Sequence, residues 1–263
     1  MHIQGSVAVI TGGARGFGQR LAEVLAERGG RVVIGDVLET EGELVAASLN
    51  RHYSSKVAVF QRCDVTQLSS IQALVERAIG EFGGLDIMVN NAGIGGTLPW
   101  IEDNGEALSK TIAINLRAPI EGTRLAVRHF RKSWKPGCIV NVSSMMAFFP
   151  MEVAPVYGAT KAALVNFTAS CATLAQLCPP VRVNTVAPSF SNTALVDDPA
   201  LQATSISQLM NLLTVDEVVE QMIRCIEDES LAGDTIRMLR GKPPLVNPGR
   251  KAVDLGALTR AKL

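Results

Sequence analysis

Tyr157 and Lys161 are the residues whose types and spacing most directly suggest chemistry, and Ser144 lies thirteen residues upstream of the tyrosine. The Tyr-Gly-Ala-Thr-Lys run is typical of a helix, in which a spacing of four places the phenol and the ammonium on one face. A free tyrosine ionises at about pH 10, and a cation beside it lowers its pKa. Such a pair could remove the proton of an alcohol. Because Tyr-x-x-x-Lys also occurs by chance, the spacing alone fits a solvated helix face as well.

A glycine-rich turn near the N-terminus lies between a predicted strand and a predicted helix. Ser6–Ile10 is an apolar run of strand length, and residues 17–28 have helical periodicity. Gly12, Gly16 and Gly18 would allow a tight turn and a close approach to pyrophosphate, while the helix N-terminus offers amides to the anion. This context favours a dinucleotide site over a glycine turn that binds nothing.

Asp36 follows a second predicted strand, Arg31–Gly35, eighteen residues beyond Gly18. A carboxylate at this point can accept hydrogen bonds from the adenosine ribose and would repel a 2′-phosphate. Arg15 instead favours NADP, because a guanidinium in the turn could bind a 2′-phosphate. The alternative is that Arg15 is only a solvated residue of the turn. We expect NAD to be the cofactor.

Strand and helix patterns alternate along the rest of the chain. Further strands are expected at 56–63, 85–90, 138–142, 181–186 and 234–239, and helices at 67–82, 105–132, 157–177 and 214–227. This rhythm, with strands apolar throughout, predicts an α/β Rossmann fold: a doubly wound parallel sheet of about seven strands with helices on both faces. We expect one domain over residues 1–240 and a basic, irregular tail at 241–263.

The composition is that of one domain with a large core. Of the 263 residues 47% are hydrophobic, and the mean hydropathy of +0.22 leaves apolar surface for an oligomer interface. The formal net charge is zero and no arginine-rich stripe is present, so nucleic acid is not an expected partner. No apolar run reaches membrane-spanning length, and the N-terminus enters a strand too early to leave room for a signal peptide. A cytoplasmic location is expected.

The cysteines show neither paired metal-ligand spacing nor a disulfide framework. Reduced, buried thiols are therefore expected, and no metal site is predicted. The five residues concerned are Cys63, Cys138, Cys171, Cys178 and Cys225.

Taken together, the motifs resemble the classical short-chain dehydrogenases/reductases over roughly residues 5 to 240. Within that family the chain is most similar to the NAD-dependent 15-hydroxyprostaglandin dehydrogenase branch, through its Met-His start, Pro155-Val156-Tyr157, Ser191-Asn192-Thr193-Ala194 and Glu227-Asp228. The resemblance implies hydride transfer between NAD(H) and a secondary alcohol or ketone. The family motifs are Thr11-Gly-x-x-x-Gly-x-Gly18, Asp64-Val65, Asn90-Asn91-Ala92-Gly93, Asn115, Ser144, Tyr157-x-x-x-Lys161 and Pro188 through Thr193.

The resemblance implies a catalytic set of Asn115, Ser144, Tyr157 and Lys161. Tyr157 would be the general acid/base, and Ser144 would hydrogen-bond the substrate oxygen. Lys161 would lower the tyrosine pKa and bind the nicotinamide ribose, and Asn115 would hold a water that relays protons to Lys161. The alternative for Ser144 is a strand-end hydroxyl that satisfies nearby backbone. For Asn115 it is a helix-kinking residue whose amide bonds to backbone.

The resemblance also implies a set of cofactor contacts. Asp64 and Val65 would flank the adenine, Asn91 would pack beside the cofactor, and Thr193 would hydrogen-bond the carboxamide. Ser189 departs from the family pattern, which has glycine there, and a positive φ would strain it. Phe17 replaces the usual Ile or Leu. The full predicted set is Gly12, Arg15, Gly16, Phe17, Gly18, Asp36, Asp64, Val65, Asn91, Tyr157, Lys161 and Thr193.

The substrate is indicated only as hydrophobic. Met and Phe are dense in Met145–Met151, and residues 200–213 read as an amphipathic part of a lid at about 189–213. Ordinary core or a dimer seam would give the same pattern. Val153 and Ala154 stand where the prostaglandin enzyme has glutamines, which argues against assuming prostaglandin. The alternatives are an NADPH-dependent carbonyl reductase and a non-catalytic NAD-binding scaffold.

Two features suggest partners. The predicted helices at 105–132 and 157–177 carry more apolar surface than one sheet face needs, so a homodimer or homotetramer is expected. Ala261-Lys262-Leu263 resembles a Ser-Lys-Leu peroxisomal address, so a peroxisomal import receptor is a possible partner if the source is eukaryotic. A chance ending is the alternative.

Overall fold

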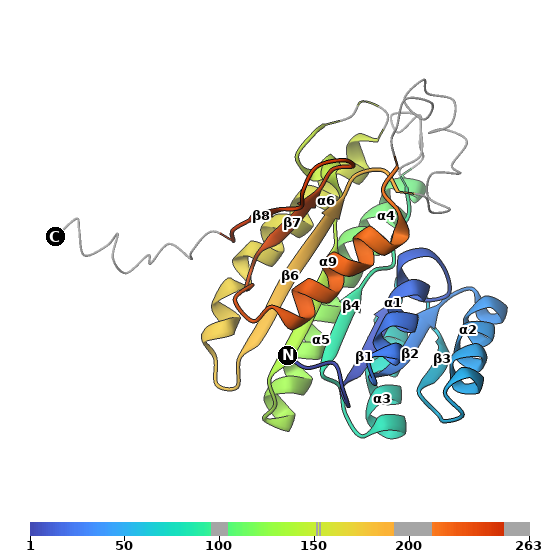
Figure 1. Cartoon of the computed structure of the whole chain (residues 1–263). Helices are drawn as coiled ribbons and strands as arrows, with labels where there is room; N and C mark the ends of the chain where they lie inside the picture. Colours follow the sequence, from blue (N-terminus) through green and yellow to red (C-terminus); the bar gives the residue numbers. More distant parts are fainter. Residues whose placement is uncertain (96–104, 151, 153, 192–211, 250–263) are drawn as a thin grey trace.

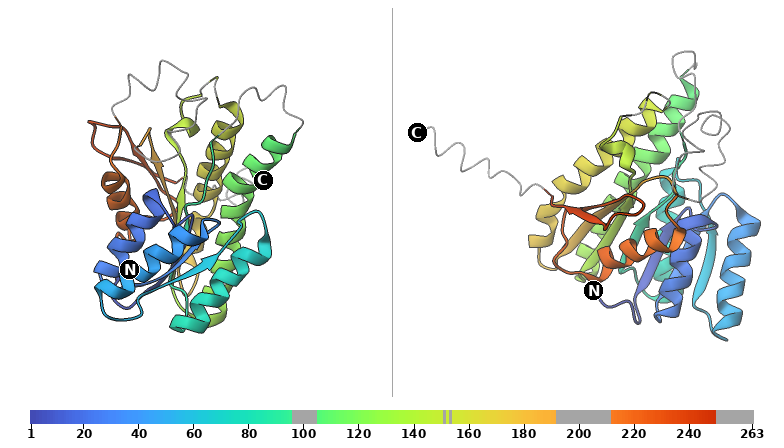
Figure 2. Two further views of the ribbon diagram at one scale, coloured as in Figure 1. Left: turned by 90° about the vertical axis from the view of Figure 1, so that its right-hand side faces the viewer. Right: turned by 45° about the horizontal axis from the view of Figure 1, so that its top comes forward.

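A parallel sheet lies between two layers of helices in the computed structural model (Figures 1 and 2). The structure describes residues 1–95, 105–150, 152, 154–191 and 212–249. The strands are β1 (Val7–Thr11), β2 (Arg31–Asp36), β3 (Ala58–Arg62), β4 (Ile87–Asn90), β5 (Gly137–Val142), β6 (Val181–Pro188), β7 (Thr235–Met238) and β8 (Leu245–Asn247). The helices are α1 (Gly16–Glu27), α2 (Glu39–His52), α3 (Leu68–Phe82), α4 (Glu106–Ile112), α5 (Ala118–Ser133), α6 (Pro155–Ser170) and α9 (Val215–Glu227), with the π-helix η1 (Ala113–Arg117) and the 3₁₀ helices η2 (Met145–Ala147) and η3 (Ala172–Gln176).

The strand order places the ends of β1 and β4 side by side. The order is β3-β2-β1-β4-β5-β6-β7-β8, and every neighbouring pair is parallel except β7 and β8. Thr11 pairs with Gly35 of β2 on one side and with Asn90 of β4 on the other. The order reverses at this point, which is where open α/β sheets bind ligands. The predicted doubly wound Rossmann fold is confirmed.

The sheet has eight strands, one more than the predicted seven. The additional strand, β8, lies in the segment that we expected to be irregular, where it pairs antiparallel with β7. It has only three residues between Pro244 and Pro248. A strand this short has no readable periodicity.

Two predicted helices are interrupted. The helix expected at 105–132 consists of α4, a π-helical stretch and α5, and the helix expected at 157–177 ends at Ser170 and continues as η3. No helix among the described residues is both long and apolar enough to cross a membrane.

The sheet is buried on both faces, as its uniformly apolar strands predict. Ile10 and Ile34 pack with α1 and α9 on one face, whereas Val9, Leu74 and Phe130 pack on the other face with α3 and α5. Helices therefore cover both faces of the sheet.

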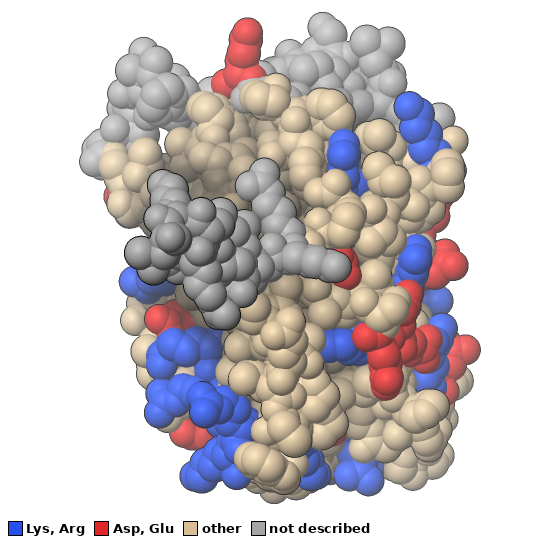
Figure 3. All heavy atoms as spheres, turned by 90° about the vertical axis from the view of Figure 1, so that its left-hand side faces the viewer, with Lys and Arg blue, Asp and Glu red and all other residues tan. Residues whose placement is uncertain are grey.

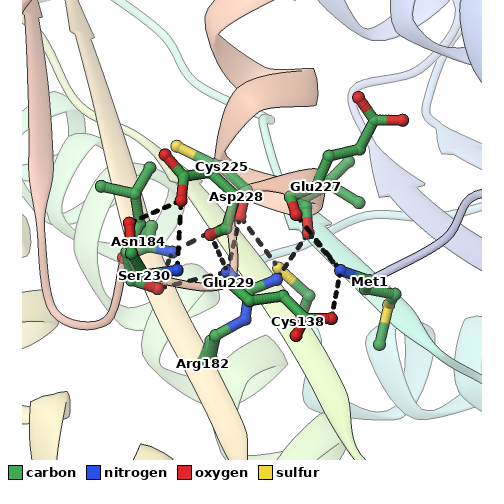
Figure 4. A network of polar contacts seen from close by, with 11 residues as sticks. Met1, Cys138, Arg182, Asn184, Cys225, Glu227, Asp228, Glu229 and Ser230 are labelled. Atoms are coloured by element: carbon green, nitrogen blue, oxygen red, sulfur yellow. Dashed lines mark hydrogen bonds and ion pairs between the residues drawn. The ribbon is translucent and has the colours of Figure 1, made fainter.

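The C-terminal end of α9 is fastened to β6 by Arg182, which is buried (Figure 4). Its Nη1 donates to the carbonyl oxygens of Cys225 at 2.9 Å and Asp228 at 3.0 Å. A cation at this end of a helix satisfies the last carbonyls and complements the helix dipole. A single buried guanidinium thus holds α9 against the sheet.

Several predictions fall outside the described residues: Thr193, most of the lid at 189–213, and the Ala261-Lys262-Leu263 tripeptide. The two flanks of the lid are described. Ser191 and Leu213 form a parallel bridge, and the amide of Leu213 donates to the carbonyl of Phe190 at 2.9 Å. The segment between them therefore begins and ends beside the carboxyl end of β6.

Candidate active site

The glycine turn between β1 and α1 packs tightly against the chain that follows β4. Gly12 and Gly16 have φ of +66° and +56°, a region that strains other residues. A Cβ on Gly12 would lie 2.8 Å from the Cα of Ala92, and one on Gly18 would overlap the Gly12 carbonyl oxygen. No side chain among the described residues caps α1, so its first amides remain available to an anion. These features fit the pyrophosphate of a dinucleotide.

Asp36 ends β2 beside this turn and is buried. One carboxylate oxygen accepts from the amide of Ala14 at 3.0 Å, and the other accepts from the amide of Leu38 at 3.1 Å. A carboxylate has further lone pairs, so it can also accept from ribose hydroxyls. Asp36 therefore shapes the turn, a function beyond its predicted role as a ribose contact. Arg15 is exposed at the N-cap of α1, and Phe17 packs half-buried against the core.

Asn91 and Thr11 tie the turn to β4. The Asn91 Nδ2 donates to the carbonyl oxygens of Thr11 at 3.0 Å and Gly12 at 2.8 Å. The Thr11 hydroxyl accepts from the amides of Asn91 at 3.1 Å and Ala92 at 3.2 Å. Asn91 was predicted to pack beside the cofactor, and its amide fixes the backbone on which the cofactor would lie.

Asp64 and Val65 lie in the turn between β3 and α3, both half-buried. The Asp64 carboxylate accepts from the amide of Thr66 at 2.9 Å and from its hydroxyl at 2.8 Å. These hydrogen bonds lower the pKa of Asp64. The carboxylate is thus committed to the local turn, which presents Val65 at the carboxyl end of the sheet.

Lys161 is buried on α6, with 4% of its surface exposed. Its Nζ donates to the carbonyl oxygen of Val142 at 2.8 Å and lies 5.5 Å from the centroid of the Tyr157 ring. Burial lowers the pKa of Lys161 from 10.5 to about 8. The predicted pairing of Tyr157 and Lys161 on one helix face is therefore present in the structure.

Tyr157 is buried, and the Ser144 hydroxyl lies near enough to influence its phenol. Burial raises the pKa of the phenol, and the hydrogen bond with Ser144 opposes that rise. Desolvation is the larger of these two effects. That Lys161 favours the phenolate of Tyr157 stays a prediction. Ser144 also accepts from the amide of Met146 at 3.2 Å. Its hydroxyl therefore satisfies backbone, as the alternative interpretation proposed, while it also contacts Tyr157.

Asn115 lies in the π-helical stretch η1 and is fully buried. Its Oδ1 accepts from the amide of Ile94 at 2.9 Å, and its Nδ2 donates to the carbonyl of Ile94 at 2.8 Å. The alternative in which backbone satisfies this amide is thus confirmed. A Cβ on Gly93 would lie 3.4 Å from the Asn115 Oδ1 and 3.5 Å from the Lys161 Nζ. Asn115 and Lys161 therefore both lie beside Gly93, in the segment that follows β4.

Arg237 of β7 contacts the segment that joins Ser144 to α6. The Arg237 guanidinium lies 4.5 Å from the centroid of the Phe148 ring and 5.8 Å from that of Phe149. Its buried Nε has no hydrogen-bond partner among the described residues. Ser189 is not at positive φ, and its amide donates to the carbonyl of Met238 at 2.9 Å. The substitution of glycine by Ser189 therefore introduces no strain.

The sequence reasoning missed a chain of buried polar side chains beneath the site. Asn90 donates to Asn141 at 2.8 Å, Asn141 donates to Thr168 at 3.0 Å, and the hydroxyls of Thr168 and Thr185 lie 2.6 Å apart. Ser143 also donates to the carbonyl of Lys161 at 2.8 Å. These bonds fasten α6 to β5 and β6. Polar residues inside apolar strands, such as Asn141 in Cys-Ile-Val-Asn-Val, were the available signal.

All five cysteines are free, as expected, but their burial differs from the prediction. Cys63, Cys138 and Cys225 are buried, whereas Cys171 is half-buried and Cys178 is exposed. Burial raises the pKa of Cys63 to about 12, so this thiol stays protonated at neutral pH.

A glycine-rich dinucleotide turn after β1, a serine after β5 and a tyrosine and a lysine on α6 together define a nicotinamide-dependent oxidoreductase that acts on alcohols or ketones. The family model described as short chain dehydrogenase matches residues 6–202, and the chain belongs to this family. The predicted family is thereby confirmed.

The relatives share most of their length with this chain. The human 15-hydroxyprostaglandin dehydrogenase [NAD(+)] is 30% identical over 257 residues, which cover 92% of this chain and 94% of the relative. The cis-4-hydroxycyclohexanecarboxylate dehydrogenase of Sinomonas cyclohexanicum is 39% identical over 191 residues, 72% of this chain and 75% of the relative. A crystal structure of 3-ketoacyl-(acyl-carrier-protein) reductase from Brucella melitensis complexed with NADH is 28% identical, with a TM-score of 0.78 over 91% of this chain and 98% of the other. The predicted similarity to the hydroxyprostaglandin dehydrogenase branch is confirmed.

Proposed function

We propose that the protein oxidises a secondary alcohol on a lipophilic molecule and uses NAD as the hydride acceptor. The observation that supports this most is the buried Lys161, whose Nζ lies 5.5 Å from the ring centroid of the buried Tyr157. A scaffold that only bound NAD would have no use for a buried amine next to a buried phenol, because both groups are costly to desolvate.

In this mechanism Tyr157 takes the proton of the substrate hydroxyl while Ser144 hydrogen-bonds the same oxygen. When NAD is bound, it accepts the hydride from the carbinol carbon. Ser144 can serve the substrate because its oxygen accepts from the amide of Met146, which leaves its own proton to be donated to the phenol or to a substrate oxygen. Lys161 holds positive charge close to the phenol and so favours the phenolate. Both polar atoms of the Asn115 side-chain amide bond to the backbone of Ile94. Asn115 thereby holds this backbone beside Lys161, where a water could relay protons.

NAD is proposed over NADP because of Asp36. Its buried carboxylate carries negative charge at the end of β2, where an adenosine ribose would lie, and would repel a 2′-phosphate. Gly12, Gly16 and Gly18 would receive the pyrophosphate, and Val65 would contact the adenine. Thr193 would bind the carboxamide. The exposed Arg15 supports the second candidate, an NADPH-dependent carbonyl reductase.

The substrate is proposed to be hydrophobic because Met145 and Ala154 are buried and Phe148 and Phe149 follow the catalytic serine. Two relatives are named for hydroxylated substrates, a hydroxyprostaglandin and a hydroxycyclohexanecarboxylate. Ala154 offers no polar contact, so a compact or hydrocarbon-rich alcohol fits better than a polar one.

The decisive experiment is a turnover screen with NAD and NADP against secondary alcohols of increasing hydrophobicity. We expect kcat/KM with NAD to exceed that with NADP and to rise with the hydrophobicity of the alcohol. A preference for NADP in the wild type would favour the reductase instead, and absence of turnover with every pair would favour the scaffold.

Assembly through α5 and α6 is proposed from the surface of α6. Its only charged residue, Lys161, is buried, so its outer face carries no charge. Figure 3 shows few charged side chains across the middle of this side of the molecule. A homodimer or homotetramer would cover that face. Ala159→Arg on α6 should dissociate it in sedimentation velocity, whereas Ala47→Arg on the exposed face of α2 should not.

Import into peroxisomes through Ala261-Lys262-Leu263 remains a proposal for a eukaryotic source. A fluorescent fusion that ends at this tripeptide should form puncta, and the same fusion without Leu263 should be diffuse. A diffuse signal from both fusions would exclude the address.

A further inference from the structure

A groove of about 760 Å³ lies between α3, α5 and the chain that enters β6. It is lined by the C-terminal half of α5 and by residues just before β6, so it lies at the amino ends of the strands. The glycine turn and Ser144 lie at the carboxyl ends. The groove is therefore separate from the active site, and its volume is that of small-molecule sites.

Basic side chains form one wall of this groove. Arg128, Arg131 and Lys132 of α5 line it, and no ion pair joins any of them to an acid among the described residues. Arg124, one turn earlier, is paired with Glu121 at 2.6 Å and does not line the groove. Because the formal net charge of the chain is zero, three unpaired cations in one groove are a local excess of charge. Figure 3 shows Lys and Arg gathered at the lower left of that view, on the side where α5 ends.

Apart from Gln72, Glu76 and His129, the rest of the groove is apolar or aromatic. Val75 and Ile79 of α3 lie along one side, and Leu125 and Leu177 contribute from α5 and the chain before β6. Ile79 is 41% exposed and Leu177 39%. Trp134 follows α5 at φ +55° and leaves 71% of its surface exposed beside the groove. A group of large apolar side chains exposed side by side indicates a binding surface, whereas single exposed apolar side chains are common and carry no such meaning.

The helix dipole accounts for part of this arrangement, since cations near a helix C-terminus are favourable. It explains Arg131 and Lys132, which lie in the last turn of α5. It does not explain the concave shape, the exposed indole or the apolar strip opposite the cations. The one acid in the groove, Glu76, accepts from Gln72 at 2.7 Å.

We propose that this groove is a second binding site, for an amphipathic anion with an alkyl chain. The head group meets Arg128, Arg131 and Lys132, and the chain lies along Val75, Ile79 and Leu177 beside Trp134. A wholly polar anion would leave the apolar strip in water, and a neutral lipid would leave the cations unpaired. The two halves of the groove together select an amphipathic anion.

Trp134 supplies a local signal for the test. The chain has two tryptophans, so Trp100→Phe leaves Trp134 as the only indole. This protein is titrated with dodecyl phosphate below its micelle concentration while the emission of Trp134 is recorded. We expect a saturable blue shift, and binding of dodecanol at least about tenfold weaker because its head group is uncharged.

Matched variants separate the groove from general lipid binding. Arg128→Ala/Lys132→Ala should weaken dodecyl phosphate about tenfold and leave turnover unchanged, because neither residue contacts the active site. Arg51→Ala, an exposed cation on α2, should have no effect. No shift of Trp134, an equal shift with dodecanol, or undiminished affinity in the double variant would each overturn the proposal.

Discussion

Lys161→Met is expected to stabilise the ligand-free protein in a way that depends on pH. The pKa of Lys161 is lowered by burial from 10.5 to about 8, so the native state disfavours its charged form. At about pH 7 the lysine is protonated in both the native and unfolded states, and the shift of about 2.5 units costs the native state about 3 kcal/mol. A methionine of similar length removes that cost.

The direction in which the stability changes with pH follows from the number of protons bound in each state. Between the two pKa values of Lys161 the unfolded chain binds more protons than the native chain, so this residue makes the wild type more stable as pH rises from about 8 to 10.5. Lys161→Met lacks this gain. Its advantage over the wild type should therefore shrink by about 2 kcal/mol between about pH 8 and pH 10.

Urea unfolding of both proteins without cofactor, at several pH values in that range, measures the difference directly. The free energies of unfolding are compared pairwise, because other lysines and tyrosines titrate identically in both proteins and cancel. The exposed Lys242→Met is the matched control and should show no such trend. A stability difference that stays constant with pH would refute the reasoning that burial destabilises charged Lys161.

Three further changes test the site. Tyr157→Phe should abolish turnover and leave NAD binding, followed by NADH fluorescence or calorimetry, nearly intact, and turnover within tenfold of the wild type would contradict its assignment as the general acid/base. Asp36→Ala should weaken NAD about ten- to hundredfold while NADP binding improves, and an equal loss for both cofactors would mean that Asp36 only shapes the glycine turn. Arg237→Met should lower kcat/KM for the alcohol more than it changes the NAD KM, because Phe148 and Phe149 lose the cation stacked on them; unchanged steady-state kinetics would show that the strand β7 does not position this segment.

The residues that sequence reasoning placed best are those whose geometry is local. Tyr157 and Lys161 share a helix face because of a spacing of four, and the glycines of the first turn lie where strand periodicity gives way to helix periodicity. Alternating strands and helices also predicted the doubly wound parallel sheet, although not the order of its strands. Strand β8 was not predicted because three residues are too few to show a hydrophobic periodicity.

The properties that depend on burial could not be read from the sequence. Spacing suggested that Lys161 lowers the pKa of Tyr157, but the desolvation that raises it arises only when α6 packs on the sheet. Nor does any local pattern reveal that Asp36 binds the amide of Ala14, twenty-two residues away, or that Asn91 binds the carbonyl of Gly12. Such contacts follow from strand order and register, which bring distant residues together.

The opposite pKa shifts of Tyr157 and Lys161 bear on the order of events in the site. Burial raises the pKa of the phenol and lowers that of the ammonium, so both groups are pushed toward their neutral forms. Because a neutral phenol cannot accept the proton of an alcohol, the proposed mechanism needs a nearby group that favours the phenolate. Added positive charge next to the phenol would favour the phenolate, and the oxidised nicotinamide ring carries such a charge. In the proposed mechanism, bound NAD would therefore favour the phenolate that takes the proton of the alcohol.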